Sequence, residues 1–266
     1  MTTPIALTIA GSDCSGGAGI QADLKTFAAL GVYGASVITA LTAQNTKGVA
    51  GIHQVPAEFV TAQIEAVFSD LAVGAVKIGM VAELAVIGAI ADGLAKWRPK
   101  HVVLDPVMVA TSGDRLLKAD AVEALRTKLI PQASLITPNL PEAAALLEES
   151  IATDESSVAS QGRRLLGFGA GAVLIKGGHG QGPQSIDYLV TEAGTVPLPA
   201  PRVATKNTHG TGCSLSSAIA AGLARGDDMG TAVRKAKAWV SAAIAAADRF
   251  SVGHGHGPIH HFHTYY

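Results

Sequence analysis

The sequence contains few cysteines, few aromatic residues and almost no excess charge. Of its 266 residues, 2 are cysteines and 5% are aromatic. Cys14 and Cys213 form neither a CxxC pair nor a metal-finger spacing, which argues against a disulfide framework and favours a reducing compartment. The formal net charge is −1, and no block of Lys or Arg stands out. This balance argues against binding of nucleic acid through a basic stripe.

Long apolar runs and targeting signals are also missing from the sequence. The most apolar region, Leu71–Leu94, is interrupted by Lys77, Glu83 and Asp92, so we interpret it as a strand plus a helix rather than a membrane span. The N-terminal residues Met1–Ile5 lack a basic segment followed by an apolar one. We therefore expect no signal peptide, no membrane partner and a cytoplasmic location.

Two familiar nucleotide-binding fingerprints are absent as well. The glycine-rich segment Gly11–Gly19 has no Lys-Ser/Thr pair after its glycines, and it does not have the spacing of a dinucleotide-binding loop. These absences argue against Walker-type phosphate binding and against a nicotinamide oxidoreductase. What remains is a glycine-rich floor on which the backbone can approach a flat ligand closely.

The sequence is rich enough in apolar residues to build a large α/β core. It is 48% hydrophobic, and short continuous apolar runs alternate with amphipathic stretches, which is typical of parallel strands covered on both faces. The expected strands are 5–10, 35–41, 75–78, 101–105, 134–137 and 172–176, with a hairpin formed by 185–190 and 195–198. The expected helices are 20–30, 57–71, 83–97, 119–129, 141–147, 156–168, a helix after residue 213 and 231–249. This alternation predicts a mostly parallel sheet with right-handed crossovers, and without a linker we expect a single domain, 1–266.

Polar and glycine-rich residues fall at the carboxyl ends of the expected strands, where open α/β sheets bind ligands. They are Gly11–Gly17, Gln44–Asn45, Gly79–Met80, Asp105–Pro106, Asn139 and Lys176–Gly178. Turns favour Gly, Asn and Asp for conformational reasons alone. Six such loops at one edge nevertheless predict a ligand site there.

The segment Lys206–Ser214 is the most informative of these loops, because it leads directly into the apolar helical stretch 215–223. Gly210 and Gly212 let the backbone approach a ligand, and a helix N-terminus attracts anions, phosphate above all. Cys213 lies at that terminus, where the same field is expected to lower the pKa of a thiol. An acid–base group beside an anion cradle suggests phosphoryl transfer. The alternative interpretation is a glycine-rich turn followed by a buried structural cysteine.

Several polar residues at this edge allow both a structural and a functional interpretation. Lys176 is either a solvated lysine at a strand end or a point charge for phosphate. Asn139–Glu142 has the pattern of a capped helix start, but its amide and carboxylate oxygens also suit Mg²⁺. Asp105 is ambiguous in the same way.

Two further side chains suit a heteroaromatic substrate. The carboxamide of Gln44 offers a donor and an acceptor, which matches a ring bearing an amine beside a ring nitrogen. Asp23, on the first helix, faces either this pocket or solvent. The tail 253–263 holds five of the nine histidines, but it lacks an HExxH motif, a nearby cysteine and a ligand carboxylate, so we expect no metal there.

Taken together, these residues resemble one family, the hydroxymethylpyrimidine/phosphomethylpyrimidine kinases of thiamin biosynthesis, within the ribokinase-like superfamily. The similarity runs in order over essentially the whole chain. The motifs that carry it are Ala10–Lys25, Ile38–Thr46, Lys77–Met80, Thr137–Glu142, Lys176–His179, Lys206–Cys213, Val252–Gly255 and His260–His263. The resemblance implies a three-layer α/β/α fold with a small hairpin or flap over the site, and a homodimer.

The resemblance also implies an activity and a base. The enzyme would transfer phosphate from ATP, with Mg²⁺, to 4-amino-5-hydroxymethyl-2-methylpyrimidine and then to the monophosphate. Cys213 corresponds to the catalytic base, where most ribokinase-like sugar kinases carry an aspartate. The N–H groups of Gly210, Thr211 and Gly212 would bind the transferring phosphate.

The same resemblance assigns the remaining residues to substrate, nucleotide or metal. Gln44 reads the aminopyrimidine edge, and Asp23 helps to orient the ring. The other ring contacts implied are Gly11, Ala18, Met80 and Val107. The nucleotide side comprises Lys176, Asn139, Glu142 and Lys237, with Asp105 and Glu142 holding Mg²⁺ mostly through water.

The nearest alternative is a pyridoxal kinase or a bifunctional vitamin kinase with the same fold. Related bacterial pyridoxal kinases place a second cysteine in the expected flap, 109–113, where this chain has Ala110, which favours the pyrimidine. Cys14 is given no role, because the family pattern is permissive at its position. A ligand-binding regulator without catalysis is a third possibility, against which the intact Cys213, Lys176, Asn139 and Glu142 argue.

Overall fold

A central sheet of eight strands carries the architecture of the protein. The computed structural model describes residues 3–108, 119–179 and 182–266. The strands of the sheet are β1 (Ile5–Ala10), β2 (Tyr33–Ile38), β5 (Ala75–Ile78), β6 (Val102–Leu104), β7 (Leu135–Ile136), β8 (Val173–Ile175), β9 (Gln184–Thr191) and β10 (Gly194–Pro201). They lie in the order β10-β9-β8-β7-β6-β5-β1-β2. β9 and β10 are antiparallel to their neighbours and the other pairings are parallel, which confirms the predicted mostly parallel sheet.

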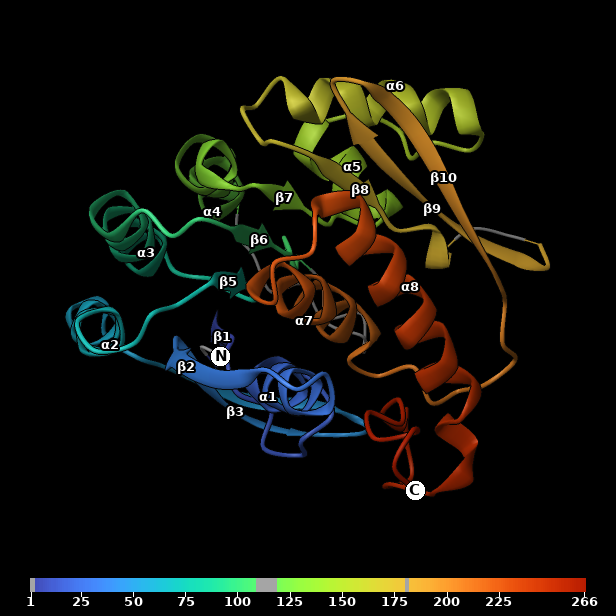
Figure 1. Cartoon of the computed structure of the whole chain (residues 1–266), viewed down its shortest axis with the longest axis horizontal. Helices are drawn as coiled ribbons and strands as arrows, with labels where there is room; N and C mark the ends of the chain where they lie inside the picture. The colour runs from blue at the N-terminus through green and yellow to red at the C-terminus, as the bar shows by residue number, and fades with distance from the viewer. Residues whose placement is uncertain (1–2, 109–118, 180–181) are drawn as a thin grey trace.

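Helices cover both faces of this sheet (Figure 1). One face carries α2 (Ala57–Phe68), α3 (Leu84–Trp97), α4 (Ala119–Ala124), α5 (Leu140–Leu147) and α6 (Glu155–Leu166). The other carries α1 (Gly19–Ala29), α7 (Thr211–Ala224) and α8 (Met229–Ala245). On β6, Val102 and Leu104 pack into the first layer and Val103 into the second, as the two-residue period of a strand requires. Both faces are apolar, which is why the strands are continuous apolar runs in the sequence.

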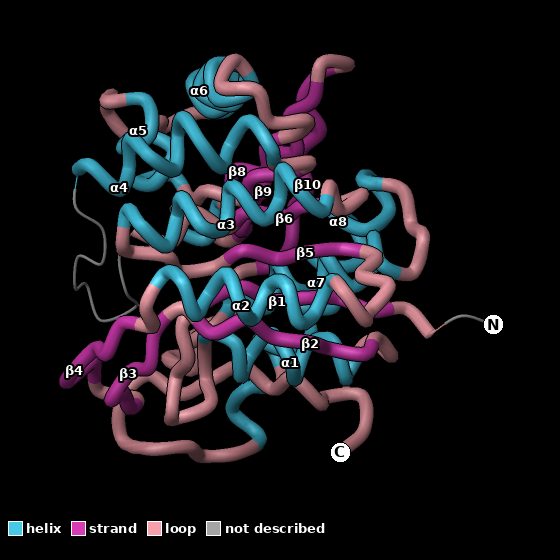
Figure 2. The backbone as a smooth tube through the Cα atoms, turned by 90° about the vertical axis from the view of Figure 1, so that its left-hand side faces the viewer, coloured by secondary structure: helices cyan, strands magenta, loops and turns pink. Residues whose placement is uncertain are grey.

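The expected strand 35–41 is in fact two strands in different sheets. β2 ends at Ile38, and after Thr39 the chain forms β3 (Ala40–Asn45), which pairs with β4 (Gly48–Gln54) in a separate two-stranded sheet. Thr39 holds the bend, because its N–H donates to the Ala10 carbonyl and its hydroxyl to the Met80 carbonyl. Figure 2 shows this hairpin beyond one end of the main strands. The prediction missed β4 because that strand is half exposed and lacks a continuous apolar run.

The hairpin expected at 185–198 is confirmed as β9–β10, which forms the antiparallel edge of the main sheet. One other expectation needs correction. The helix expected at 119–129 changes at Leu125 to a π-helical turn ending at Leu129, just before Pro131, which has no N–H with which to continue a helix. The flap expected at 109–113, with Ala110, lies outside the described residues. Among the described residues, no helix has the length and apolarity needed to span a membrane.

A fully buried ion pair joins the helix layer of α1 and α7 to the sheet. Lys77 of β5 lies 2.9 and 2.8 Å from the two carboxylate oxygens of Asp23 on α1. Thr8 of β1 and Ser217 of α7 each donate to that carboxylate at 2.6 Å. Burial alone would lower the pKa of Lys77, but the charges of Asp23, Cys213 and Asp105 raise it. The lysine therefore stays charged.

We expect each single substitution in this pair to destabilise the fold more than the double substitution does. Asp23→Asn leaves the Lys77 charge unpaired, and Lys77→Met leaves the Asp23 charge unpaired; either loss of a buried partner costs about 3–5 kcal/mol. The double variant Asp23→Asn/Lys77→Met leaves no unpaired buried charge and should recover much of the lost free energy of unfolding. Chemical denaturation measures all three free energies of unfolding, and a double variant as unstable as the two singles summed would refute the coupling.

Candidate active site

A cavity of about 700 Å³ opens where the parallel strands of the sheet end. It is lined by the loops after β1, β5, β6, β7 and β8, by the hairpin β3–β4, by the start of α7 and by one side of α8. All but one of the residues predicted for the site line this cavity. They are Gly11, Ala18, Gln44, Met80, Asp105, Val107, Asn139, Glu142, Lys176, Gly210, Thr211, Gly212, Cys213 and Lys237.

Asp23 is the exception, and the expectation that it orients the ring is wrong in this structure. Its carboxylate is fully buried beneath the cavity floor, with no exposed surface. It is fully occupied by Lys77, Thr8 and Ser217. Its position one helical turn past the glycine-rich loop suggested the pocket, but that position faces inward, toward Lys77.

The loop before α7 forms the cradle predicted for an anion. Gly210 caps the helix with φ of 78°, and a Cβ atom there would lie 1.9 Å from the Gly17 carbonyl oxygen. Only glycine therefore fits where this loop crosses the glycine-rich loop 11–19. The first turn of α7, which begins at Thr211, presents N–H groups that have no partner within the helix. The Thr211 N–H donates to the Thr208 carbonyl at 3.2 Å, and residues 208–213 line the cavity.

Cys213 lies in that first turn, but its acidity differs from the expectation. Burial raises the pKa of the thiol, the nearby charge of Lys77 opposes this, and the charges of Asp23 and Asp105 raise the pKa further. The prediction of a lowered pKa considered the helix terminus alone and missed the burial of the thiol and the two carboxylates near it. At neutral pH the group is therefore a thiol, and it becomes a strong base only when deprotonated.

Two carboxylates and one ammonium group meet at the ends of β6, α5 and β8. Lys176 Nζ lies 2.6 Å from Asp105 Oδ1 and 3.8 Å from Glu142 Oε2, and these two carboxylates raise its pKa despite burial. Lys176 is thus neither solvated nor isolated. Thr137 donates to the same Asp105 oxygen at 3.0 Å.

The helix start at Asn139 has the predicted cap. Asn139 Oδ1 accepts from the Glu142 N–H, and Glu142 Oε2 accepts from the Asn139 N–H, both at 2.8 Å. Burial raises the pKa of Glu142, Lys176 lowers it, and Asp105 raises it again. The capping interpretation is confirmed, and it does not exclude a metal role because the cap uses only one of the carboxylate oxygens.

The charges around Lys176 fit a divalent cation. Asp105 and Glu142 together carry one more negative charge than Lys176 neutralises, and their oxygen atoms are the ligands that Mg²⁺ prefers. The described residues contain no cluster of three or more His, Cys, Asp or Glu side chains able to hold a metal. A Mg²⁺ ion here would therefore keep several waters, as this ion usually does.

Lys237 enters the cavity from α8 but is already paired. Its Nζ lies 2.8 Å from Asp187 Oδ2 on β9, and the other Asp187 oxygen accepts from the Gly177 N–H at 2.8 Å. Asp187, which the sequence prediction missed, thus ties this lysine to the loop after β8.

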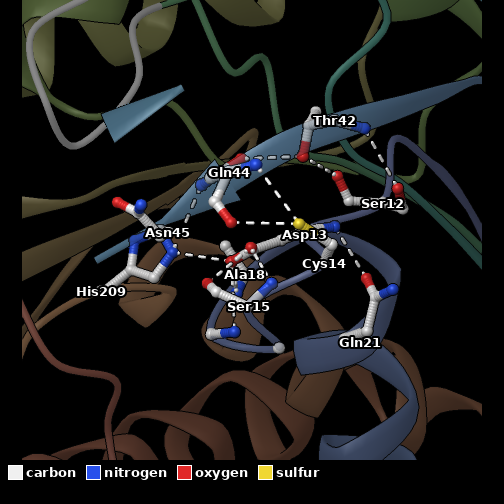
Figure 3. A network of polar contacts seen from close by, with 12 residues as sticks. Ser12, Asp13, Cys14, Ser15, Ala18, Gln21, Thr42, Gln44, Asn45 and His209 are labelled. Carbon is white, nitrogen blue, oxygen red and sulfur yellow. Dashed lines mark hydrogen bonds and ion pairs between the residues drawn. The ribbon is translucent and has the colours of Figure 1, made fainter. Parts of the chain in front are cut away.

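The sequence prediction also missed the contact between Asp13 and His209, shown in Figure 3. Asp13 Oδ2 lies 2.8 Å from His209 Nε2 and accepts from the Ala18 N–H at 2.8 Å. Both residues occur in motifs that were singled out. Their contact spans 196 positions of sequence, so no local pattern indicates it.

The histidine-rich tail packs against α7 and the loop before it. His261 Nε2 lies 2.9 Å from the Ser214 hydroxyl on α7, and His209 forms a β-bridge with Pro258. Burial lowers the pKa of His261 to about 3. The tail thus packs against the loop before α7 and the first turn of that helix.

Comparison with known proteins shows which family this chain is similar to. The sequence profile described as phosphomethylpyrimidine kinase matches residues 13–260. A hydroxymethylpyrimidine/phosphomethylpyrimidine kinase from Rhizobium meliloti is 59% identical over 99% of both chains.

Solved structures share the fold. A phosphomethylpyrimidine kinase from Clostridium difficile superposes with a TM-score of 0.81 at 45% identity, over 90% of this chain and 99% of that one. Bacillus subtilis pyridoxal kinase, solved as an ADP complex, gives 0.91 at 34% identity, over 98% of both chains. The ribokinase-like three-layer architecture is confirmed, and the chain belongs to the phosphomethylpyrimidine kinase family.

Proposed function

We propose that this protein transfers the γ-phosphoryl group of ATP to the hydroxymethyl oxygen of 4-amino-5-hydroxymethyl-2-methylpyrimidine, and then to the resulting monophosphate, for thiamin biosynthesis. The observation that carries the proposal is a single cavity containing a thiol, an anion cradle and a carboxamide able to read an aminopyrimidine. Its volume of about 700 Å³ is in the range of small-molecule sites. The family name of the Rhizobium meliloti relative supports the substrate.

The substrate half of the cavity suits a flat, amine-bearing ring. Gln44 supplies a donor and an acceptor side by side, matching an amine beside a ring nitrogen. Gly11 and Ala18 form the floor, and Met80 and Val107 offer apolar contacts to the faces of the ring. A Cβ atom at Gly11 would lie 2.5 Å from the Met80 methyl carbon, so the absence of a side chain there preserves the floor.

The nucleotide half of the cavity suits phosphate groups. Gly210, Thr211 and Gly212 line it at the start of α7, where the helix dipole favours negative charge. The Thr211 N–H also donates to the Thr208 carbonyl at 3.2 Å. Lys176 lies beside this turn, since a Cβ atom at Gly212 would be 3.4 Å from its Nζ. Lys237 and Asn139 line the same half.

In the proposed reaction the residues of the chain position the reactants and stabilise charge, which is what phosphoryl transfer requires of a protein. Cys213, in its thiolate form, accepts the proton of the attacking alcohol while the bond from the alcohol oxygen to the γ-phosphorus forms and ADP leaves. The N–H groups of the loop before α7 and the ammonium group of Lys176 stabilise the negative charge that develops on the transferring phosphoryl oxygens. Asp105 and Glu142 would hold Mg²⁺ mostly through water, and the ion would neutralise phosphate charge when bound.

The two phosphorylation steps make different demands on Cys213. The first acceptor is an alcohol, which must lose a proton as the new bond to phosphorus forms. The second acceptor is a phosphate oxygen, which already carries charge at neutral pH. The thiol is therefore needed more in the first step than in the second.

A second candidate function is phosphorylation of a pyridoxal-type alcohol. The structural likeness to Bacillus subtilis pyridoxal kinase favours it, with a TM-score of 0.91. The 59% identity to a hydroxymethylpyrimidine/phosphomethylpyrimidine kinase favours the pyrimidine as the main substrate. Offering each alcohol separately with MgATP and measuring ADP release distinguishes the two.

The proposal includes a cytoplasmic homodimer. Both cysteines are free, and a thiol base needs a reducing compartment to stay reduced. On the β3–β4 hairpin, Ile52 pairs with Thr42 and both line the cavity, whereas Leu41 lies on the opposite, outer face and is 47% accessible. A second copy of the chain covering this hairpin would remove that apolar surface from water.

The most direct test of the function is mass-spectrometric detection of the mono- and diphosphate made from the pyrimidine alcohol and MgATP. We expect Cys213→Ala to lower kcat of the first step by about 10²–10⁴-fold, the usual cost of losing a general base, with little change in KM and a smaller loss in the second step. Cys14→Ser is the matched control and should behave as wild type. Wild-type protein that forms neither product, or an unchanged first-step kcat in Cys213→Ala, would contradict the proposal.

The raised pKa of Cys213 predicts a pH dependence for the first step. A thiol titrates near ~8.5 in its ordinary state, and here burial and two carboxylates shift its pKa upward. The thiolate fraction, and with it kcat for the alcohol, should therefore still be rising above pH ~8.5. Phosphorylation of the monophosphate should depend less on pH. A first-step kcat that is constant from neutral pH upward would argue against deprotonation of this thiol.

Substituting Glu142 should weaken the response to Mg²⁺ without unfolding the protein. Glu142→Gln keeps a carbonyl oxygen for the helix cap, since Gln also serves at this position, but it removes the charge. We expect the Mg²⁺ concentration for half-maximal rate to rise about 10–100-fold, the usual effect of changing a group that orients a metal site. Glu148→Gln, at the other end of α5, should leave the Mg²⁺ curve unchanged; equal curves for both variants would rule out a metal role for Glu142.

A further inference from the structure

A chain of polar contacts leads from the glycine-rich loop to the carboxamide of Gln44 (Figure 3). It begins at Asp13, which is 1% exposed. Oδ1 of Asp13 accepts from the N–H and the hydroxyl of Ser15, and Oδ2 accepts from the N–H groups of Gly17 and Ala18. Burial acts to raise the pKa of Asp13, but the hydrogen bonds from His209, Ser15 and Ala18 hold it well below its usual range. Asp13 is therefore an anion that can only accept hydrogen bonds.

This anion fixes the proton on His209. The ring nitrogen Nε2 lies 2.8 Å from Asp13 Oδ2, so Nε2 must carry a hydrogen and donate it. The backbone of His209 is itself held, because its N–H donates to the Gly257 carbonyl and its carbonyl accepts from the Ile259 N–H. Asp13 thus sets both the tautomer and the place of the ring, as a carboxylate does for many functional histidines.

The same Nε2 atom faces the carboxamide of Gln44. Gln44 Nε2 lies 3.4 Å from His209 Nε2, and Gln44 Oε1 lies 3.2 Å from the Thr42 hydroxyl. The single hydroxyl hydrogen of Thr42 is directed to the Ser12 carbonyl at 2.8 Å. If the amide nitrogen lay beside His209, two donors would face each other. In the turned carboxamide, Gln44 Oε1 instead shares the single Nε2 hydrogen that His209 donates to Asp13, as the longer branch of a three-centre hydrogen bond, and Gln44 Nε2 donates to Thr42. The two ends of a carboxamide have the same shape, so these partners decide its orientation.

We infer that His209, held by Asp13, is a positioning residue that fixes the orientation of the Gln44 carboxamide and so sets the preference for an amine beside a ring nitrogen. This inference rests on the proposed function. One lone pair of Gln44 Oε1 is engaged by His209, and one hydrogen of Gln44 Nε2 is engaged by Thr42. The carboxamide therefore presents its remaining acceptor and its remaining donor to the cavity. The acceptor meets the amine of the 4-aminopyrimidine, and the donor meets the adjacent ring nitrogen.

A 4-oxo analogue of the pyrimidine alcohol has the opposite pattern. Its carbonyl would meet the Gln44 oxygen, and its ring N–H would meet the Gln44 amide hydrogens. Sites that hydrogen-bond a substrate reject a mismatched analogue strongly, because buried polar groups are left unpaired. Without His209 the carboxamide is free to turn, and the analogue becomes a better substrate relative to the amine.

The test compares kcat/KM for the 4-amino and the 4-oxo alcohol within each protein preparation, so that a reduced folded fraction cancels from the ratio. His209→Phe keeps a flat ring but removes the donor. We expect its amino-to-oxo ratio to fall about tenfold, the effect of one hydrogen bond. His209→Gln places an N–H at the same reach and should retain most of the preference. His261→Phe removes the other buried histidine contact, to Ser214, and should leave the ratio unchanged.

Thr42→Val provides a second route to the same result, because it removes the partner at the other end of the carboxamide. It should lower the ratio in the same direction, even if His209→Phe gives no folded protein. A ratio equal to that of wild type in His209→Phe, or in Thr42→Val where His209→Phe does not fold, would overturn the inference and leave His209 with a structural role. Wild-type protein inactive on the 4-amino alcohol would instead overturn the proposed function and this inference with it.

Discussion

The contact between the carboxylate of Asp13 and the loop before α7 is the constraint on which the site depends. One side chain binds N–H groups of the glycine-rich loop and the ring of His209 together. Beside it, Gly210 fits against the Gly17 carbonyl at a distance that no side chain allows. These two contacts bring the first loop of the chain against the start of the seventh helix. The surface for a flat ring and the cradle for phosphate are consequently two walls of one cavity.

The charged groups beneath and beside the cavity are arranged in pairs that leave few isolated charges. Lys77 is paired with Asp23, and Lys176 lies between Asp105 and Glu142. Because burial of the thiol, together with the charges of Asp23 and Asp105, outweighs the effect of Lys77, the pKa of Cys213 is higher than a helix N-terminus alone would make it. A weakly acidic thiol is a strong base once it is deprotonated. The same excess of negative charge favours a divalent cation where the nucleotide phosphates would lie.

Much of this could be predicted from the sequence, for identifiable physical reasons. The buried parallel strands are continuous apolar runs, and the loops that follow them carry Gly11, Asp105, Asn139 and Lys176 to one edge, so the location of the site followed from fold class alone. The cap at Asn139 is local and was predicted correctly. The homologous motifs supplied the roles of Cys213 and Gln44, which the residues by themselves left open, and those roles remain proposals.

What the sequence could not show depends on contacts between distant segments. Asp23 is buried because it faces Lys77 of β5, and the pKa of Cys213 is raised by burial of the thiol and then by the charges of Asp23 and Asp105. Both effects depend on residues far apart in the sequence. The bend at Thr39 is fixed by carbonyls of Ala10 and Met80, so an apolar run that looks like one strand becomes two. The pairing of Asp13 with His209 carries no local signature at all.

A crystal structure of the protein with the pyrimidine alcohol and a non-hydrolysable ATP analogue would test the central claim most directly. The account predicts that both ligands occupy the cavity at the same time, with the hydroxymethyl oxygen within hydrogen-bonding distance of the Cys213 sulfur and the terminal phosphate over Gly210–Gly212. A pyrimidine bound elsewhere, or one whose hydroxymethyl group points away from Cys213 while the analogue fills the cradle, would contradict it.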